Sequence, residues 1–404
     1  MAFAKVGKTQ LISFAKKQII SKNPYSFEYE MNGKRLWEGE PEDSFIAEDG
    51  REIPVYRDHR YNLKKCWSVY GPVAALRELI SKELVSESTK AFFKECIGHR
   101  TITKPFNEIR EEVKPYIEKH EDLFISKNIP DIGKRLMKPT ITETVSLINR
   151  KGTEHQILIE NINRNVSKKI KSGDKVLEIG YTSGGESVIA FEKCGLKAIG
   201  IDNYYHDAVE ATNRHECVVQ NYKNEATFLR GDITKETEIE ESSLDLVYSL
   251  SVIEHITDLE GAFREMYRIL KPGAVMFHRY DPYFHILGGH SHSTLDSPWA
   301  HLRLSEADLE RYIKELRPYE APVTLPWIKN ALNRKHSQSN VLALLSKAGF
   351  KVSMWQNVNM KPENQQLLTN EIITDCIRVN NDKALTISDL NSGAVAFLAE
   401  KPMA

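Results

Sequence analysis

Apolar residues change their spacing along the chain near residue 170. Beyond this point, short apolar runs alternate with glycine turns and with segments of helical periodicity, a rhythm typical of a parallel α/β sheet. Seven of the runs are expected to be strands, at residues 175–179, 197–202, 226–229, 244–249, 274–278, 351–356 and 394–400. The pattern therefore predicts one doubly wound α/β sheet of seven strands.

Helices between these strands are marked by start and stop signals. The expected signals are a capping box at Thr257 and Glu260, a stop at Lys271-Pro272-Gly273, a start at Ser305 with Asp308, and a helix over Val341–Ala348 closed by Gly349. Such caps supply hydrogen-bond partners for the unpaired groups at helix ends. Clear helices are therefore expected between several of the strands.

The chain before residue 141 has a different pattern of predicted elements. Two hairpins are predicted, one with its turn at Asn32-Gly33 and one with its turn at Glu48-Asp49-Gly50, because these pairs favour tight turns. Helices are expected from Pro72, over 87–97, over 106–124 and over 141–168. We expect a smaller N-terminal α+β domain over residues 1–140, acting as a lid, an acceptor-selecting element or a dimer contact, and the sheet domain over residues 141–404.

Composition excludes several classes of protein. The chain has 404 residues, with 55 Lys and Arg against 56 Asp and Glu and a net charge of −1, which argues against a general binder of polyanions. The five cysteines form no C-x-x-C pair, so a zinc ribbon or a dithiol redox site is not expected. No apolar run is long enough for a membrane span. We expect a cytoplasmic protein without a membrane partner.

The most informative segment is Val176-Leu-Glu-Ile-Gly180-Tyr-Thr-Ser-Gly184-Gly185. An apolar strand ends in an acid, and a glycine turn then leads into a helix, an arrangement that lets the backbone approach a ligand closely. A nicotinamide-binding turn would need glycine where Thr182 stands. Glu178 would also repel a pyrophosphate, so an NAD(P)-dependent enzyme is disfavoured.

Three acids follow the first three strands of the sheet. Glu178 suits a cationic amino-acid tail, Asp202 can accept from both hydroxyls of a ribose, and Asp232 can accept from an adenine amine while Ile233 packs on the ring. A ribose, an adenine and an ammonium-bearing tail together describe S-adenosyl-L-methionine (SAM). The sequence therefore predicts SAM as the cofactor.

Over roughly residues 145–404 the chain resembles the class I SAM-dependent methyltransferases, which have a Rossmann-like sheet. The ordered matches are Glu178-x-Gly180, Asp202, Gly231-Asp232, Leu244 to Glu254-His255, and Arg268-Ile-Leu-Lys-Pro-Gly273. Thr182 departs from the glycine usual at that position. The resemblance implies a methyltransferase whose cofactor residues are Glu178, Gly180, Thr182, Gly184, Asp202, Asn203, Asp232, Ile233 and Ser249.

The acceptor is expected at the ends of the fourth and fifth strands. Five of the 13 histidines lie between His278 and His301, and histidine is the side chain that most readily takes a proton near neutral pH. A hydroxyl acceptor needs such a base. The predicted catalytic residues are His255, Asp281, His290 and His301, with His292 as a further candidate. We expect a small-molecule acceptor, with oxygen as the methylated atom.

Other interpretations stay open at this point. Glu254-His255 resembles part of a metal-binding segment of certain O-methyltransferases, but Ser251 stands where the first acid of that segment would be, and no metal site is predicted. A nucleic-acid acceptor is not expected, although an RNA or protein methyltransferase is an alternative. So is a SAM-binding module without activity. A homodimer is compatible with the sequence.

Overall fold

The apolar runs after residue 170 form the strands of one sheet. The computed structural model describes residues 141–403 except 182–183, 204–208, 223, 290–294, 296, 317–320 and 361; before residue 141 it describes residues 30–31, 34–35, 37, 40–41, 43–56, 83, 85–96, 115–116 and 119. The strands are β5 (Lys175–Ile179), β6 (Lys197–Asp202), β7 (Thr227–Arg230), β8 (Leu244–Leu250), β9 (Leu270–Tyr280), β10 (Lys351–Asn359) and β11 (Ser392–Glu400). The predicted seven-stranded sheet is confirmed.

The order of the strands is β10-β11-β9-β8-β5-β6-β7. Strands β5 to β9 pair in parallel, whereas β11 pairs antiparallel with both β9 and β10. Strands β6 and β7 lie on one side of β5, and β8 and β9 lie on the other. The strand order therefore reverses between β5 and β8. Ligands of open α/β sheets bind at this reversal, outside the carboxyl ends of the strands.

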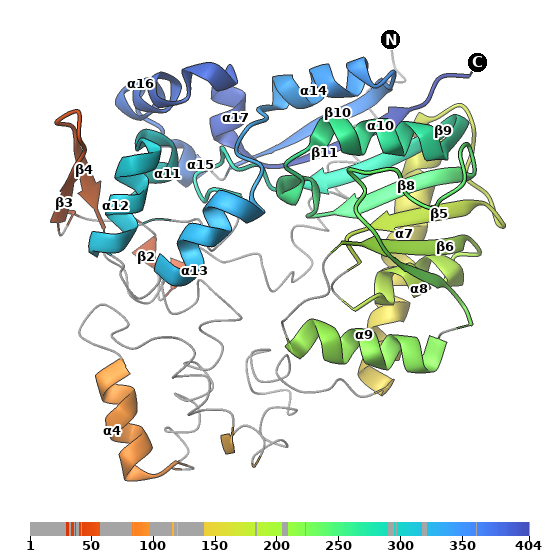
Figure 1. The fold of residues 1–404 in the computed structure, drawn as a ribbon, viewed down its shortest axis with the longest axis horizontal. Helices are drawn as coiled ribbons and strands as arrows, with labels where there is room; N and C mark the ends of the chain where they lie inside the picture. Colours follow the sequence, from red (N-terminus) through yellow and green to blue (C-terminus); the bar gives the residue numbers. More distant parts are fainter. Residues whose placement is uncertain are drawn as a thin grey trace.

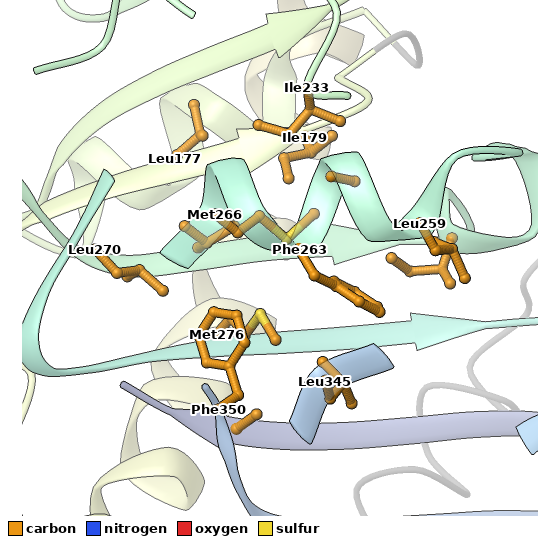
Figure 2. Close-up of a cluster of buried hydrophobic side chains, with 14 of the residues drawn as sticks. Leu177, Ile179, Ile233, Leu259, Phe263, Met266, Leu270, Met276, Leu345 and Phe350 are labelled. Carbon is orange, nitrogen blue, oxygen red and sulfur yellow. The ribbon is translucent and has the colours of Figure 1, made fainter. Parts of the chain in front are cut away.

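Helices cover both faces of the sheet (Figure 1). On one face lie α10 (Leu259–Ile269) and α14 (Gln338–Lys347), on the other α7 (Ile141–Asn165) and α8 (Glu186–Lys193), with α9 (Val209–Tyr222) beyond them. Figure 2 shows Phe263 and Met266 of α10, together with Leu345 of α14, among the side chains that fill the space between these two helices and the sheet. Because strands such as β8 are buried on both faces, they have apolar runs instead of simple alternation.

Two predicted boundaries are wrong, namely the start of α10 and the start of β9. The N-cap of α10 is Asp258, not Thr257, and its Oδ1 atom accepts a hydrogen bond from Gly261 N at 2.9 Å. Glu260 forms an ion pair with Lys347 of α14 instead of closing a capping box. Strand β9 begins at Leu270 and not after Gly273, because Leu270 already pairs with Leu244 of β8.

A second hydrophobic core lies beside the sheet. Its helices come from the connection between β9 and β10 and from the one between β10 and β11. They are α11 (Ala300–Arg303), α12 (Glu306–Leu316), α13 (Ala321–Pro326), η4 (Trp327–Ala331), α15 (Pro362–Gln365), α16 (Asn370–Val379), η5 (Asn381–Lys383) and α17 (Ile387–Asn391). Figure 1 shows most of these helices grouped beside the hairpin of β3 (Asp43–Ile46) and β4 (Glu52–Val55). Phe45 and Ile53 of the hairpin share this core with Trp299 and Tyr312.

Both predicted hairpins are present. Strand β1 (Glu30–Met31) pairs antiparallel with β2 (Lys34–Arg35), and β3 pairs with β4. The predicted helix at 87–97 is α4 (Glu87–Cys96). The helices expected from Pro72 and over most of 106–124 lie outside the described residues, and the division at residue 140 stays a prediction.

Buried charges attach the β3–β4 hairpin to the second core. Arg51 Nη2 donates to Arg303 O at 2.8 Å, and Arg51 Nη1 lies 3.1 Å from Asp375 Oδ1. Arg303 Nε contacts the other oxygen of Asp375 at 3.0 Å. The carboxylate of Asp375 therefore connects the hairpin, α11 and α16.

No helix within the described part of the chain is long and apolar enough to cross a membrane.

Candidate functional site

The parallel strands end at one edge of the sheet and place several predicted site residues there. Glu178 and Gly180 lie at the end of β5, and Asp202 is the last residue of β6. Gly231, which follows β7, donates its N–H to Asp202 O at 2.9 Å. Acids predicted to contact three parts of one ligand are therefore neighbours on adjacent strands.

The glycine turn after β5 requires residues without a side chain. Gly180 has a φ of 75°, and a Cβ atom there would lie 2.4 Å from Val252 Cγ2. The segment after β8 therefore packs directly on this turn. Gly184 and Gly185 also have positive φ values, and Gly185 is the N-cap of α8. Thr182 lies outside the described residues.

Glu178 is a buried acid with unsatisfied hydrogen-bonding capacity. Only 6% of the residue is exposed, and burial raises the pKa of its carboxyl group from 4.5 to about 7. Among the described residues, none donates a hydrogen bond to Glu178 Oε2. A ligand that brings a positively charged N–H donor would satisfy this atom, so the site fits the ammonium group of SAM.

The remaining predicted cofactor residues differ in their surroundings. Asp202 is buried, and Asn203 beside it is exposed. Asp232 Oδ1 accepts from the backbone N and the hydroxyl of Thr234, at 2.9 and 2.8 Å. Ile233 is buried and lies beside Ile179 in the core (Figure 2). Its contact with an adenine ring stays a prediction.

Ser249 lies in the interior of the sheet domain. Its residue is fully buried, and its hydroxyl oxygen is 2.6 Å from His278 Nδ1 on β9. Burial lowers the pKa of His278 to about 3, so this histidine is neutral. The pair connects two neighbouring strands, and a contact of Ser249 with the cofactor stays a prediction.

The turn η2 (Ile253–His255) follows β8 at the site edge. Ser251, just before it, has a φ of 56°, a strained value for a residue with a side chain. Its N–H donates to Arg279 O at 2.7 Å, and Arg279 Nη2 forms an ion pair with Asp281 at 3.1 Å. Burial, and then the charge of Asp281, raise the pKa of Glu254 well above its usual value. The surroundings of Glu254 therefore favour its protonated form.

His255 has one ring nitrogen fixed by the backbone. The distance from His255 Nδ1 to Ala331 O is 2.6 Å, and the ring packs edge-on against Trp327. Asn333 N donates to Glu254 O, also at 2.6 Å. These contacts, one from the His255 ring and one between backbone groups, therefore hold Ala331 at the end of η4 and Asn333 after it against the turn that carries His255.

The histidines after β9 are less exposed than the sequence suggests. His301 is buried, and its Nε2 atom donates to Tyr283 O at 3.0 Å. Burial lowers the pKa of His301 to about 4 and that of His285 to about 3. These two rings are therefore neutral in the free protein, and the catalytic role of His301 stays a prediction. His290 and His292 lie outside the described residues.

A cavity of about 900 Å³ has Thr257, two residues after η2, in its lining, and its volume is within the size range of small-molecule sites. Its lining includes Thr257, Tyr283, His301, Asn333, Arg334 and Asp308. One wall is the segment held by Glu254 O, and most lining side chains are polar or charged. Of the predicted catalytic residues that are described, His301 lines this cavity, and Asp281 lies near η2.

No metal cluster supports the alternative of a metal site. Across the described residues, no group of three or more His, Cys, Asp or Glu side chains is placed to hold a metal ion.

Two residues that belong to no sequence motif lie beside Glu178, namely Ser187 of α8 and His155 of α7. Only the packing of α7 and α8 brings them there, and no local signal could have indicated His155.

Comparison with known proteins agrees with the geometry of the sheet. Residues 151–353, half of the 404-residue chain, match the family described as "Methyltransferase domain" (Methyltransf_23). The chain belongs to this family, and it is a SAM-dependent class I methyltransferase. The expected fold class, enzyme class and cofactor are thereby confirmed.

Relatives of known activity match a limited part of the chain. The chain is 31% identical over 106 residues to the sterol 24-C-methyltransferase of Yarrowia lipolytica, covering 26% of this chain and 27% of that protein. It is 31% identical over 119 residues to the enzyme of the same name from Saccharomyces cerevisiae, covering 28% and 30%. The match thus spans less than a third of these relatives.

Similarity to solved structures is weak over the whole chain. The [4+2]-cyclase SpnF has 13% identity and a TM-score of 0.37, covering 62% of this chain and 82% of its own. Phosphoethanolamine N-methyltransferase 2 of Haemonchus contortus, solved with S-adenosylhomocysteine, has 19% identity and a TM-score of 0.35, covering 72% and 58%.

Proposed function

We propose that this methyltransferase acts on a small-molecule acceptor, that the acceptor atom is an oxygen, and that His255 removes its proton. The observation that carries the proposal is the 2.6 Å contact between His255 Nδ1 and Ala331 O. Because a carbonyl oxygen only accepts, Nδ1 carries the hydrogen, and the neutral ring has its lone pair on Nε2. Burial lowers the pKa of His255, which favours this neutral form near neutral pH.

When bound, SAM supplies an electrophilic methyl group attached to a positively charged sulfur. Glu178 would bind its ammonium group, Asp202 its ribose hydroxyls and Asp232 its adenine amine. His255 Nε2 would take the acceptor's proton as the oxygen–carbon bond forms and the carbon–sulfur bond breaks. A base of this kind contributes roughly 10²–10⁴-fold to the rate.

The cavity lined by Thr257 supports a small and polar acceptor. Its volume of about 900 Å³ suits a metabolite, and Asn333, Arg334 and Asp308 give its wall hydrogen-bonding groups. The wall is attached through Asn333 N to Glu254 O, next to His255. An acceptor with several polar groups would therefore find hydrogen-bonding partners in this cavity.

A carbon acceptor is the second candidate. It is favoured by the 31% identity to sterol 24-C-methyltransferases, whose name specifies a methylated carbon. Adding a methyl group to a carbon–carbon double bond also leaves a proton to be removed, so a base beside the methyl group would serve either reaction. The polar lining of the cavity favours the oxygen acceptor over a sterol.

The acceptor can be identified with labelled cofactor. The purified protein is incubated with SAM carrying a ¹³C methyl group and a pool of cellular metabolites, and the product is examined by NMR, which distinguishes O-methyl from C-methyl carbons. An O-methyl product that disappears in His255→Ala supports the proposal. A C-methyl product selects the second candidate. SAM binding without turnover on any pool would indicate a module without activity.

A further inference from the structure

Glu178 lies beside two buried polar side chains, from α8 and α7, on one face of the sheet. Ser187, the second residue of α8, lies beside the Glu178 carboxylate, and its hydroxyl lowers the pKa of that group. The Ser187 hydroxyl oxygen is 3.1 Å from His155 Nε2 on α7. Both Ser187 and His155 are 3% exposed. Three polar side chains from a strand and two helices thus meet out of contact with bulk water.

Hydrogen bonding among these side chains has one preferred direction. An ionised carboxylate only accepts, so the Ser187 O–H donates to Glu178, and the Ser187 oxygen then accepts from His155 Nε2–H. His155 Nδ1 is buried, and no described residue is its hydrogen-bond partner. In the reversed direction Nδ1 would carry the hydrogen and leave a buried N–H unpaired, which is unfavourable.

Packing fixes the ring of His155 in this position. The ring stacks on Phe191 with centroids 3.8 Å apart and planes 14° apart, and its edge faces Tyr248 at 5.5 Å. Burial, and then the charge of Lys151, lower the pKa of His155 well below its usual value. His155 is therefore a neutral, oriented donor.

We propose that Ser187 and His155 are positioning residues that orient the Glu178 carboxylate toward the ammonium group of SAM. No described residue donates to Glu178 Oε2, so this oxygen is left for the ammonium group. The inference rests on the assignment of Glu178 to that group, and it is independent of which acceptor is methylated. Neither residue touches the reacting atoms in this arrangement; both act through Glu178.

Binding of SAM then depends on the ionisation of Glu178. Burial raises the pKa of this carboxyl group to about 7, while Lys151 and the Ser187 hydrogen bond oppose that rise. The other groups that face it are Glu186, Asp202 and Tyr248. Removing the Ser187 donor favours the protonated form further, because a hydrogen bond to a charged group is lost.

The test measures the SAM dissociation constant by calorimetry from about pH 5.5 to about pH 8.5, without any acceptor. In the unmodified enzyme, affinity should fall as pH decreases through about 7. Ser187→Ala should move this midpoint upward by about one pH unit and weaken binding about 10-fold on the acid side. His155→Phe, which keeps a stacked ring, should move the midpoint upward by a smaller amount. Ser187→Thr, which keeps the hydroxyl, should have the midpoint of the unmodified enzyme.

Two controls separate the possible failures. In Glu178→Gln the acid-side dependence should disappear; if it persists, the assignment of Glu178 to the ammonium group is wrong. An unmoved midpoint in both Ser187→Ala and His155→Phe, with folding verified by circular dichroism, would overturn the positioning role. If Ser187→Ala does not fold, His155→Phe decides alone. A failure to find an acceptor leaves this test unaffected, since only binding is measured.

Discussion

Replacing Glu178 by glutamine should stabilise the cofactor-free protein while weakening its affinity for SAM. The carboxyl group is buried at the end of β5 and its pKa is raised from 4.5 to about 7. A raised acid pKa means that folding favours the protonated form. The folded state is therefore destabilised wherever the group must ionise, and glutamine, which is neutral and similar in shape, removes this effect.

The magnitude follows from the two pKa values. At about pH 8 the group is ionised in both the folded and the unfolded state, and the shift corresponds to about 3 kcal/mol of lost stability. At about pH 5 the folded state keeps its proton, and the loss is below about 1 kcal/mol. The destabilisation develops as pH rises from the unfolded value of 4.5 through the folded value of about 7.

Urea unfolding monitored by tryptophan fluorescence measures this difference. Without SAM, Glu178→Gln should exceed the unmodified protein in free energy of unfolding by about 3 kcal/mol at about pH 8 and by less than about 1 kcal/mol at about pH 5. Saturating SAM should stabilise the unmodified protein more than the variant. Glu236→Gln, on an exposed residue, serves as the control without such a pH dependence.

Two results would refute the reasoning. A Glu178→Gln variant no more stable than the unmodified protein at the higher pH would mean that burial does not strain the carboxylate. An equal gain at both pH values would mean that the gain arises from packing and not from ionisation. The predicted outcome would show that the carboxylate needed to bind SAM lowers the folding stability of the cofactor-free protein.

Three further variants test other parts of the molecule. Asp202→Ala should weaken SAM binding severely, and unchanged affinity in calorimetry would contradict its place in the site. His255→Ala should lower turnover roughly 10²-fold or more while leaving the SAM dissociation constant nearly unchanged; full turnover would remove it from the reaction. Asp375→Asn should destabilise the fold by about 3 kcal/mol, because Arg303 and Arg51 would lose a buried counter-charge; an unchanged urea midpoint would exclude this.

The strands of the sheet and the acids at its edge could be predicted because their signals are local. Strand β5 has the predicted bounds Lys175–Ile179, and β6 the predicted bounds Lys197–Asp202. Apolar runs buried on both faces are recognisable without knowledge of their partners. The carboxyl ends of parallel strands share one edge, so Glu178 and Asp202 are neighbours once the sheet is predicted.

The histidines after β9 show where local signals are insufficient. Their number predicts an acceptor site, which stays a prediction; the structure adds that His301 and His285 are buried and neutral and that His301 lines the cavity. Whether a histidine faces solvent, a ligand or the core depends on the residues packed against it. Those residues come from distant segments, as with Tyr283 O against His301 and Ala331 O against His255.

By itself, the sequence determined the class of fold, the cofactor and the edge of the sheet at which the predicted cofactor acids lie, because hydrophobic period, turn residues and strand-end acids act over a few neighbouring positions. Only the tertiary structure decided that the β3–β4 hairpin shares a core with the helices after β9, and that Ser187 and His155 stand behind Glu178. These arrangements depend on contacts between distant segments, where burial and desolvation set the protonation state of each group.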